Sequence, residues 1–184
     1  DKNFEKNNII LVGRLTKQKN FKLFINSFQQ ISEKFPDLKA NIIGEGELKS
    51  EIINLIKSKK LENKIKLIGF KENIFKYYKN SKIFVLSSLW EDPGFVLVEA
   101  GFLNLTVISS DCPNGPLEIL DNGNRGFLFK NNNVNSLKNC LSKVLETSSE
   151  EIINKKLLNK KNLKKFTIFS HYSLLEKNLT IDEN

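Results

Sequence analysis

The chain of 184 residues is poor in sulfur and has no methionine. Its two cysteines, Cys112 and Cys140, lie far apart and have no histidine nearby. This spacing fits neither a zinc site nor a disulfide framework, so reduced thiols in a cytoplasmic protein are the simplest interpretation. Because methionine is absent and residues 1–8 are mostly polar, we expect a linker at 1–8 and a fragment of a longer protein.

Long apolar runs are also absent. No run approaches the roughly 20 residues that a membrane-spanning helix needs, and no signal peptide opens the chain. We therefore expect a cytoplasmic location, with peripheral association at the inner face of the membrane as the alternative. A chain of this length with 40% hydrophobic residues suits one domain with a sizeable core.

Arginine is scarce although the net charge is +8, because only Arg14 and Arg125 among the 29 basic residues are arginine. Abundant lysine, asparagine and isoleucine are typical of an AT-rich genome, which favours lysines that simply solvate the surface. The alternative is attraction of anions, and segment 49–82 is the most basic, with ten lysines against three acids. Proteins that read nucleic acids favour arginine and clustered aromatics, so we expect no nucleic-acid partner.

Short β-branched runs alternate with segments of helical spacing along the chain. The predicted strands are 9–12, 39–43, 65–68, 83–86, 106–109 and 126–129. The predicted helices are 21–34 with Asn20 as N-cap, 47–59, 74–79, 94–102, 116–120 and 135–146, followed by a helical tail. This alternation implies parallel pairing with right-handed crossovers. The expected fold class is α/β, a doubly wound parallel six-stranded Rossmann-like sheet with a C-terminal helical tail.

In such sheets ligands bind beyond the carboxyl ends of the strands. The loop after the first strand contains Gly13, Arg14 and Lys19. The planar guanidinium of Arg14 suits phosphate oxygens, and Lys19 adds a point charge. A surface turn with incidental charges is the alternative interpretation. The loop has neither the dinucleotide-binding pattern of three glycines nor a P-loop.

The next two loops carry weaker signals. Gly44 and Gly46 follow the second strand and permit the close approach of a ligand, although they also suit an ordinary turn. Phe70 follows the third strand, where its exposed backbone would suit the edge of a base.

The loop after the fourth predicted strand is the most informative. Asp92 is the candidate N-cap of the helix that Pro93 and Gly94 begin. A helix N-terminus offers free amides and a positive dipole end to a phosphate. Glu91 precedes this helix and Glu99 lies little more than one turn inside it. Because helical side chains lean toward the N-terminus, both carboxylates would flank one ligand.

Residues 95–98 of this segment are apolar and are predicted to be buried. A carboxylate at Glu99 among buried neighbours would need a functional reason. The alternative is a capping carboxylate at Glu91 and a helix-face charge at Glu99. The following loop, 109–119, again supplies small residues and a helix start beside a strand end.

Several of these segments together resemble a known family. They are 12–15 with Lys19, 42–46, 68–70, 87–100, 109–119 and 126–128. In this order they resemble the carboxyl-terminal domain of the retaining GT-B glycosyltransferases called the group 1 family. The sequence departs from the family at Asn20, where glycine is usual, at 101–103, and at 104–106, which lacks the usual Gly-x-Pro.

The resemblance implies roles for individual residues. Arg14 and Lys19 would hold the donor diphosphate and stabilise the leaving group, and Glu91 would contact the transferred sugar, so these are the expected catalytic residues. Glu99 would bind the ribose hydroxyls. The expected donor-binding positions are Gly13, Gly44, Phe70, Gly94, Phe95, Val96 and Glu99. The substrate would be a nucleoside-diphosphate sugar, with UDP favoured. Neither a metal nor another cofactor is expected, because protein cations replace the metal.

The resemblance also implies a division of the chain. Residues 9–146 would form the nucleotide-sugar-binding domain, and 147–184 would be helices that pack on it or on an absent amino-terminal domain, with Tyr172, Leu174 and Leu175 as contacts. That absent domain would bind a glycan or lipid-linked acceptor. The fragment alone is therefore expected to transfer little sugar.

Two other functions remain open from the residues. The lysine-rich face would suit a non-catalytic module that binds anions or a membrane surface. A nucleotide-sugar epimerase would have a similar architecture, but it usually carries a histidine in the site loops. The only histidine here, His171, lies in the helical tail, where a structural or surface role is expected.

Overall fold

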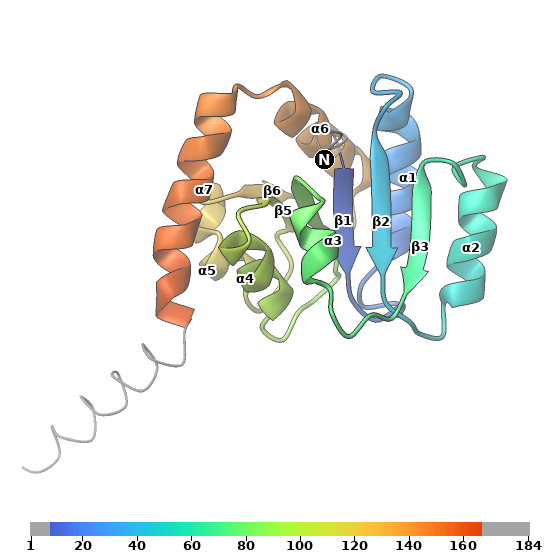
Figure 1. The fold of residues 1–184 in the computed structure, drawn as a ribbon, viewed down its shortest axis with the longest axis horizontal. Helices are drawn as coiled ribbons and strands as arrows, with labels where there is room; N and C mark the ends of the chain where they lie inside the picture. The colour runs from blue at the N-terminus through green and yellow to red at the C-terminus, as the bar shows by residue number, and fades with distance from the viewer. Residues whose placement is uncertain (1–7, 167–184) are drawn as a thin grey trace, which may run out of the picture.

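The computed structural model describes residues 8–166 and confirms the expected fold class. Its six strands form one sheet of order β3-β2-β1-β4-β5-β6, in which every pairing is parallel (Figure 1). The strands are β1 (Asn8–Val12), β2 (Lys39–Ile43), β3 (Ile65–Gly69), β4 (Ile83–Leu86), β5 (Thr106–Ser110) and β6 (Phe127–Phe129). β1 thus begins at the last residue of the expected linker.

Helices cover both faces of the sheet, as continuous apolar strands predict. They are α1 (Phe21–Ser32), α2 (Lys49–Ser58), α3 (Phe75–Lys79), α4 (Phe95–Phe102), α5 (Pro116–Ile119), α6 (Val134–Glu146) and α7 (Ser149–Leu163), with 3₁₀ turns η1 (Asp121–Gly123) and η2 (Lys164–Phe166). α1, α2 and α6 pack on one face, and α3, α4, α5 and α7 pack on the other.

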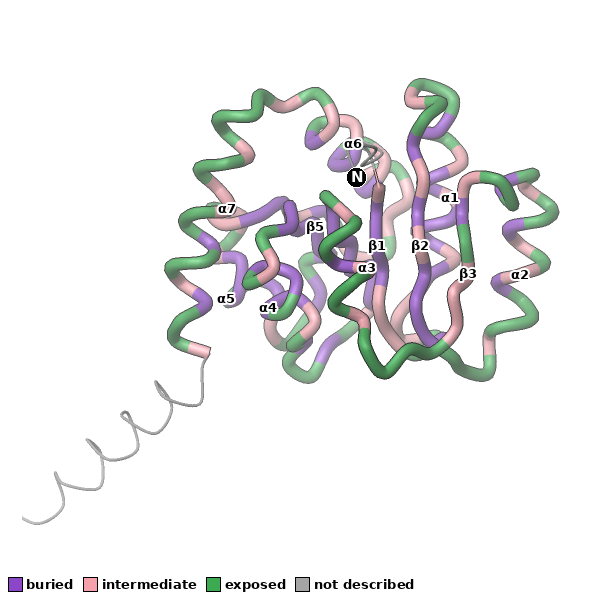
Figure 2. The backbone as a smooth tube through the Cα atoms, viewed as in Figure 1, coloured by how far each residue is buried: buried purple, intermediate pink, exposed green. Residues whose placement is uncertain are grey.

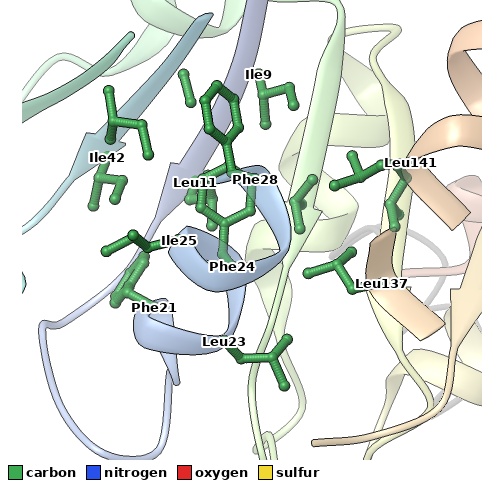
Figure 3. Close-up of a cluster of buried hydrophobic side chains, with 14 of the residues drawn as sticks. Ile9, Leu11, Phe21, Leu23, Phe24, Ile25, Phe28, Ile42, Leu137 and Leu141 are labelled. Carbon is green, nitrogen blue, oxygen red and sulfur yellow. The ribbon is translucent and has the colours of Figure 1, made fainter. Parts of the chain in front are cut away.

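Alternate residues of each strand enter opposite cores because strand side chains have a period of two. Ile9 and Leu11 of β1 join the core under α1, whereas Ile10 joins the core under α4. In the first core the rings of Phe24 and Phe28 lie 5.6 Å apart between centroids, and they point into the same apolar cluster as β1, β2 and α6 side chains (Figure 3). The sheet interior is accordingly buried, whereas the outward side of α7 is exposed (Figure 2).

One predicted N-cap is wrong, and another is confirmed in position but makes no capping hydrogen bond. The N-cap of α4 is Gly94, at φ +82°, and Asp92 and Pro93 precede it, so the assignment of Asp92 as N-cap was wrong. Glycine enters this left-handed conformation without a Cβ clash. Asn20 does occupy the N-cap position of α1, but its φ is +46° and its side chain makes no capping hydrogen bond. Asparagine tolerates that region better than most residues, which explains how it replaces the family's usual glycine.

α7 packs against α4 through a glycine. A Cβ on Gly101 would lie 2.4 Å from Cδ1 of Leu163 and 2.8 Å from Nδ2 of Asn159. The departure from the family at 101–103 therefore includes a glycine where any larger residue would make the Leu163 and Asn159 side chains shift.

Among residues 8–166, no helix combines the length and apolar character that crossing a bilayer requires. His171, Tyr172, Leu174 and Leu175 lie outside the described residues.

Candidate functional site

Lys19 and Glu91 lie in the loops after β1 and β4, the two neighbouring strands from which the strand order runs in opposite directions across the sheet. β1 is flanked by β2 and β4, with Ile10 in register with Phe84. Successive crossovers run outward from β1 on one side and from β4 on the other, so the loops after β1 and β4 diverge, and this is the position where open α/β sheets bind ligands. The arrowheads of β1, β2 and β3 point to the same edge of the molecule (Figure 1). The loops that carry Lys19 and Glu91 both leave the sheet at this edge.

Lys19 and Glu91 form an ion pair at this point. The Lys19 Nζ donates to Oε1 of Glu91 at 2.7 Å and to Oε2 at 2.8 Å. The Lys19 side chain is 15% exposed and that of Glu91 only 2%. The Ser88 hydroxyl also donates to Oε1. The buried carboxylate is therefore compensated by one cation and one hydroxyl, as a buried charge requires.

Gly13 makes room for the lysine stem. A Cβ at Gly13 would lie 3.3 Å from both Cγ and Cδ of Lys19, which is tight packing for any side chain. Gly13 therefore lets the Lys19 side chain pass close to the end of β1 on its way to Glu91.

Serine hydroxyls tie the loops together. The Ser87 Oγ donates to the Lys19 carbonyl at 2.9 Å, and the Ser110 Oγ donates to the Ser88 carbonyl at 2.7 Å. The Leu89 amide donates to the Gln18 carbonyl at 2.8 Å. Sequence reasoning assigned no role to these serines. The signal was available, since small hydroxyl residues directly after two neighbouring strands can bond backbone groups of adjacent loops.

Glycines let two pairs of loops approach backbone to backbone, those after β1 and β2 and those after β4 and β5. A Cβ on Gly44, where φ is +148°, would lie 1.9 Å from the Gly13 carbonyl oxygen. A Cβ on Gly115, where φ is +118°, would lie 2.0 Å from the Pro93 carbonyl oxygen. The Gly44 amide also donates to the Gly69 carbonyl at 3.1 Å. Gly44 is thus a structural residue of the site's rim.

The start of α4 lies beside the ion pair. A Cβ on Gly94 would lie 3.3 Å from Cγ of Glu91, so Glu91 passes under the helix cap. The Leu97 amide makes the first turn's bond, to the Gly94 carbonyl at 3.0 Å. The amides of Phe95 and Val96 precede that bond, and amides at such positions have no intrahelical acceptor. These two N–H groups are therefore available to donate hydrogen bonds to an anion.

The prediction that 95–98 are all buried was wrong. Phe95 is 60% exposed and Val96 half-buried, whereas Leu97 and Val98 are buried. Glu99 is itself exposed, because α4 turns its small and aliphatic face, not its acid, toward the core. One Glu99 oxygen, Oε2, accepts a hydrogen bond from the hydroxyl of Tyr78 at 3.2 Å. Tyr78 is a contact that sequence reasoning missed.

Arg14 and Phe70 lie on the rim. Both side chains are exposed, Phe70 by 68%. Within residues 8–166 Arg14 forms no salt bridge. The structure therefore brings Lys19, Glu91 and the start of α4 together, and leaves Arg14 at the edge of the same group of loops.

The chemistry of this group favours an anionic ligand. Arg14, Lys19 and the free amides of α4 present positive charge or positive dipole ends.

In the part of the chain that the structure describes, no three His, Cys, Asp or Glu side chains gather as a metal site would need.

The model of the family described as "Glycosyl transferases group 1" matches residues 1–167. The chain is 36% identical over 138 residues to the N-acetylgalactosamine-N,N'-diacetylbacillosaminyl-diphospho-undecaprenol 4-alpha-N-acetylgalactosaminyltransferase of Campylobacter jejuni, covering 75% of this chain and 37% of that protein. It is 33% identical over 153 residues to the UDP-Gal:alpha-D-GlcNAc-diphosphoundecaprenol alpha-1,3-galactosyltransferase of Escherichia coli, covering 82% and 39%. The chain thus spans little more than a third of the length of these relatives.

Solved structures share the fold. The carboxyl-terminal domain of a group 1 family glycosyl transferase from Francisella tularensis superposes with a TM-score of 0.79 at 25% identity, covering 89% of this chain and 87% of that one. A mutant of Staphylococcus aureus TarM, solved with fondaparinux, alpha-GlcNAc-glycerol and UDP, superposes with a TM-score of 0.85 at 23% identity, covering 98% and 36%.

Proposed function

The chain belongs to the group 1 glycosyl transferases, and on that basis we propose that it is the donor-binding part of a retaining glycosyltransferase. The donor would be a UDP-sugar bound where the loops after β1 and β4 diverge. The observation that carries this proposal is the convergence of Lys19, Glu91 and the free amides of α4 where those two loops diverge.

The phosphate roles follow from charge. Negative charge grows on the leaving diphosphate during transfer, and preorganised cations and amides stabilise it there. An ammonium has three donors, and Glu91 engages the Lys19 group through its two oxygens. We propose that Lys19 meets the diphosphate while Glu91 holds it, that Arg14 closes over the phosphates from the rim, and that no metal is needed.

The remaining donor contacts are proposed from position. Glu99 would accept the ribose hydroxyls through its exposed carboxylate, and the backbone at Phe70 would meet the base. Glu91 would contact the transferred sugar. Because Glu91 is 2% exposed and Lys19 donates to both of its oxygens, Lys19 would have to release Oε2 for that contact. UDP is favoured as the nucleotide because the Escherichia coli relative is named for UDP-Gal.

The acceptor is proposed from the names of relatives alone. The Campylobacter jejuni and Escherichia coli relatives are named for sugars linked to undecaprenol through a diphosphate. We propose a lipid-linked glycan acceptor, held by an amino-terminal domain of the kind that the family implies, and little transfer by this chain alone.

Calorimetric titration of this chain with UDP, GDP and ADP tests the donor proposal. We expect UDP to bind, and the Glu99→Ala variant to raise its Kd about tenfold or more, as the loss of a hydrogen bond to a charged group implies. Glu118→Ala is the matched control, since Glu118 is an exposed carboxylate on neighbouring α5. Absence of nucleotide binding below millimolar concentration, or equal effects of the two variants, would contradict the proposal.

A membrane contact is favoured by α7. Ile153 and Leu157 are one helical turn apart and are 55% and 62% exposed. Lys160 and Lys161 follow on the exposed side. Apolar side chains beside lysines suit an anionic bilayer surface, where lysine stems lie in the interface and the ammonium groups meet lipid phosphates. We propose that this face of α7 rests on anionic lipid.

Sedimentation with phosphatidylglycerol vesicles tests this contact. We expect salt-sensitive binding that Leu157→Glu weakens about tenfold, because one leucine leaves the bilayer. Leu117→Glu, which alters an exposed leucine on α5, should leave binding unchanged. Equal binding by the Leu157→Glu variant and the unaltered chain would argue against a lipid-facing α7.

A further inference from the structure

Tyr78 is buried directly behind an exposed carboxylate. It is only 1% exposed and heads the largest completely buried side chains of the described residues. Its ring packs against Phe84 of β4, with centroids 6.0 Å apart. Its hydroxyl reaches the side of the core where α3 meets α4 and donates to Oε2 of Glu99 at 3.2 Å. The ring is thus held by packing while the hydroxyl is aimed at one oxygen of Glu99.

We propose that Tyr78 is a positioning residue that orients the Glu99 carboxylate for the ribose hydroxyls of the donor, and so sets the preference for ribose over deoxygenated sugars. This inference rests on the proposed function, in which Glu99 accepts those hydroxyls. Tyr78 itself would touch neither the donor nor the reacting atoms.

The direction of the hydrogen bond supports this role. Burial, and then the charge of Glu99 and the hydrogen bond to it, raise the pKa of Tyr78 far above its ordinary value. The phenol therefore stays protonated and can only donate to the carboxylate. With Oε2 engaged, Oε1 of Glu99 is left for the ligand.

Without this bond Glu99 would be an ordinary exposed helix side chain. Such side chains sample several rotamers, and a ligand must order them on binding. Because the buried Tyr78 hydroxyl already holds the Glu99 carboxylate, less conformational entropy is lost when the ligand binds. Only ligands that contact the Glu99 carboxylate gain affinity in this way. A merely structural role of Tyr78 would instead affect the affinity of all ligands equally.

The ratio of two dissociation constants tests the inference. UDP and 2′,3′-dideoxy-UDP differ only in the hydroxyls that Glu99 would bind. We expect the unaltered chain to prefer UDP, and Tyr78→Phe to reduce that preference about fivefold, as the loss of one neutral donor predicts. Binding of the dideoxy ligand should not change. Tyr77→Phe is the matched control, because it removes the same hydroxyl from the adjacent half-buried residue, which has no bond to Glu99 within the described residues.

The outcomes separate this inference from the proposed function. Equal affinity of the unaltered chain for both ligands would remove the ribose role of Glu99, and the role of Tyr78 with it. A ribose preference that Glu99→Ala abolishes and Tyr78→Phe leaves intact would overturn the positioning role alone. Loss of the preference in Tyr78→Phe but not in Tyr77→Phe supports it.

A second measurement uses the unaltered chain, in case the variant fails to fold. The chain has three tyrosines, so the ring carbon that bears each hydroxyl can be followed separately by carbon-13 labelling. We expect UDP to shift the Tyr78 resonance and dideoxy-UDP to leave it in place. Identical responses to both ligands would overturn the inference.

Discussion

The Lys19→Met variant is expected to lose about 3 kcal/mol of unfolding free energy, because removal of one partner from a buried ion pair leaves the other charge uncompensated. Glu91 is 2% exposed and both of its oxygens accept from Lys19. Methionine fills the stem but cannot donate. Chemical denaturation at neutral pH measures the loss, and UDP binding should be abolished in the same protein.

Two controls isolate the ion pair. Lys22→Met breaks the Lys22–Glu51 pair, whose side chains are 40% and 54% exposed, and should cost under about 1 kcal/mol, as surface pairs do. The double variant Lys19→Met/Glu91→Gln removes both charges and should recover more than half of the lost stability, without recovering UDP binding. If the loss of stability in the double variant equals the sum of the losses in Lys19→Met and in Glu91→Gln alone, Lys19 and Glu91 do not depend on each other as we infer.

Gly44→Ala is expected to cost about 4 kcal/mol or more, a size reached only when buried structure is forced apart. The new Cβ would lie 1.9 Å from the Gly13 carbonyl oxygen. This is backbone against backbone, so no side-chain rotation relieves the contact. The β1 and β2 loops would have to separate, which would also displace Lys19 and weaken UDP binding. Thermal or urea unfolding, together with titration of UDP into the folded variant, measures both effects.

Gly123→Ala is the matched control for backbone strain. Gly123 also has a positive φ, +92°, but the nearest atom to its Cβ is 3.7 Å away. The alanine there should cost only about 1–2 kcal/mol, the penalty for left-handed backbone in a residue with a Cβ. Equal losses at the two positions would mean that φ, and not the approach of the loops, explains the need for glycine at Gly44.

The architecture could be predicted from local patterns. The strand 39–43 was predicted with the bounds that the structure has, and 83–86 likewise. A few residues of sequence suffice to distinguish the apolar period of a helix from that of a strand. The alternation of strands and helices then predicts that the strands pair in parallel. Because the carboxyl ends of parallel strands share one edge of the sheet, loops with Arg14, Lys19 and Glu91 could be expected at that edge. The strand order, with β1 beside β4, came from the structure. Their roles toward a donor remain predictions.

The contacts inside the site could not be predicted in this way. Lys19 and Glu91 lie 72 residues apart in sequence, and each was assigned to a ligand, not to the other. Tyr78 and Glu99 are 21 residues apart on different helices. The N-cap of α4 was assigned to Asp92 and not to Gly94, because proline and aspartate signal a turn without fixing which residue takes the left-handed conformation.

The sequence by itself determined the order of strands and helices along the chain, their apolar faces, and the loops rich in charge and glycine, because these features depend on residues close together in the sequence. Only the tertiary structure decided which charges compensate each other, that Glu91 is buried and Glu99 exposed, and which glycines face a backbone. The physical reason is that burial and pairing depend on distances between loops from separate strands. Those distances are set once the whole sheet and both helical layers have packed.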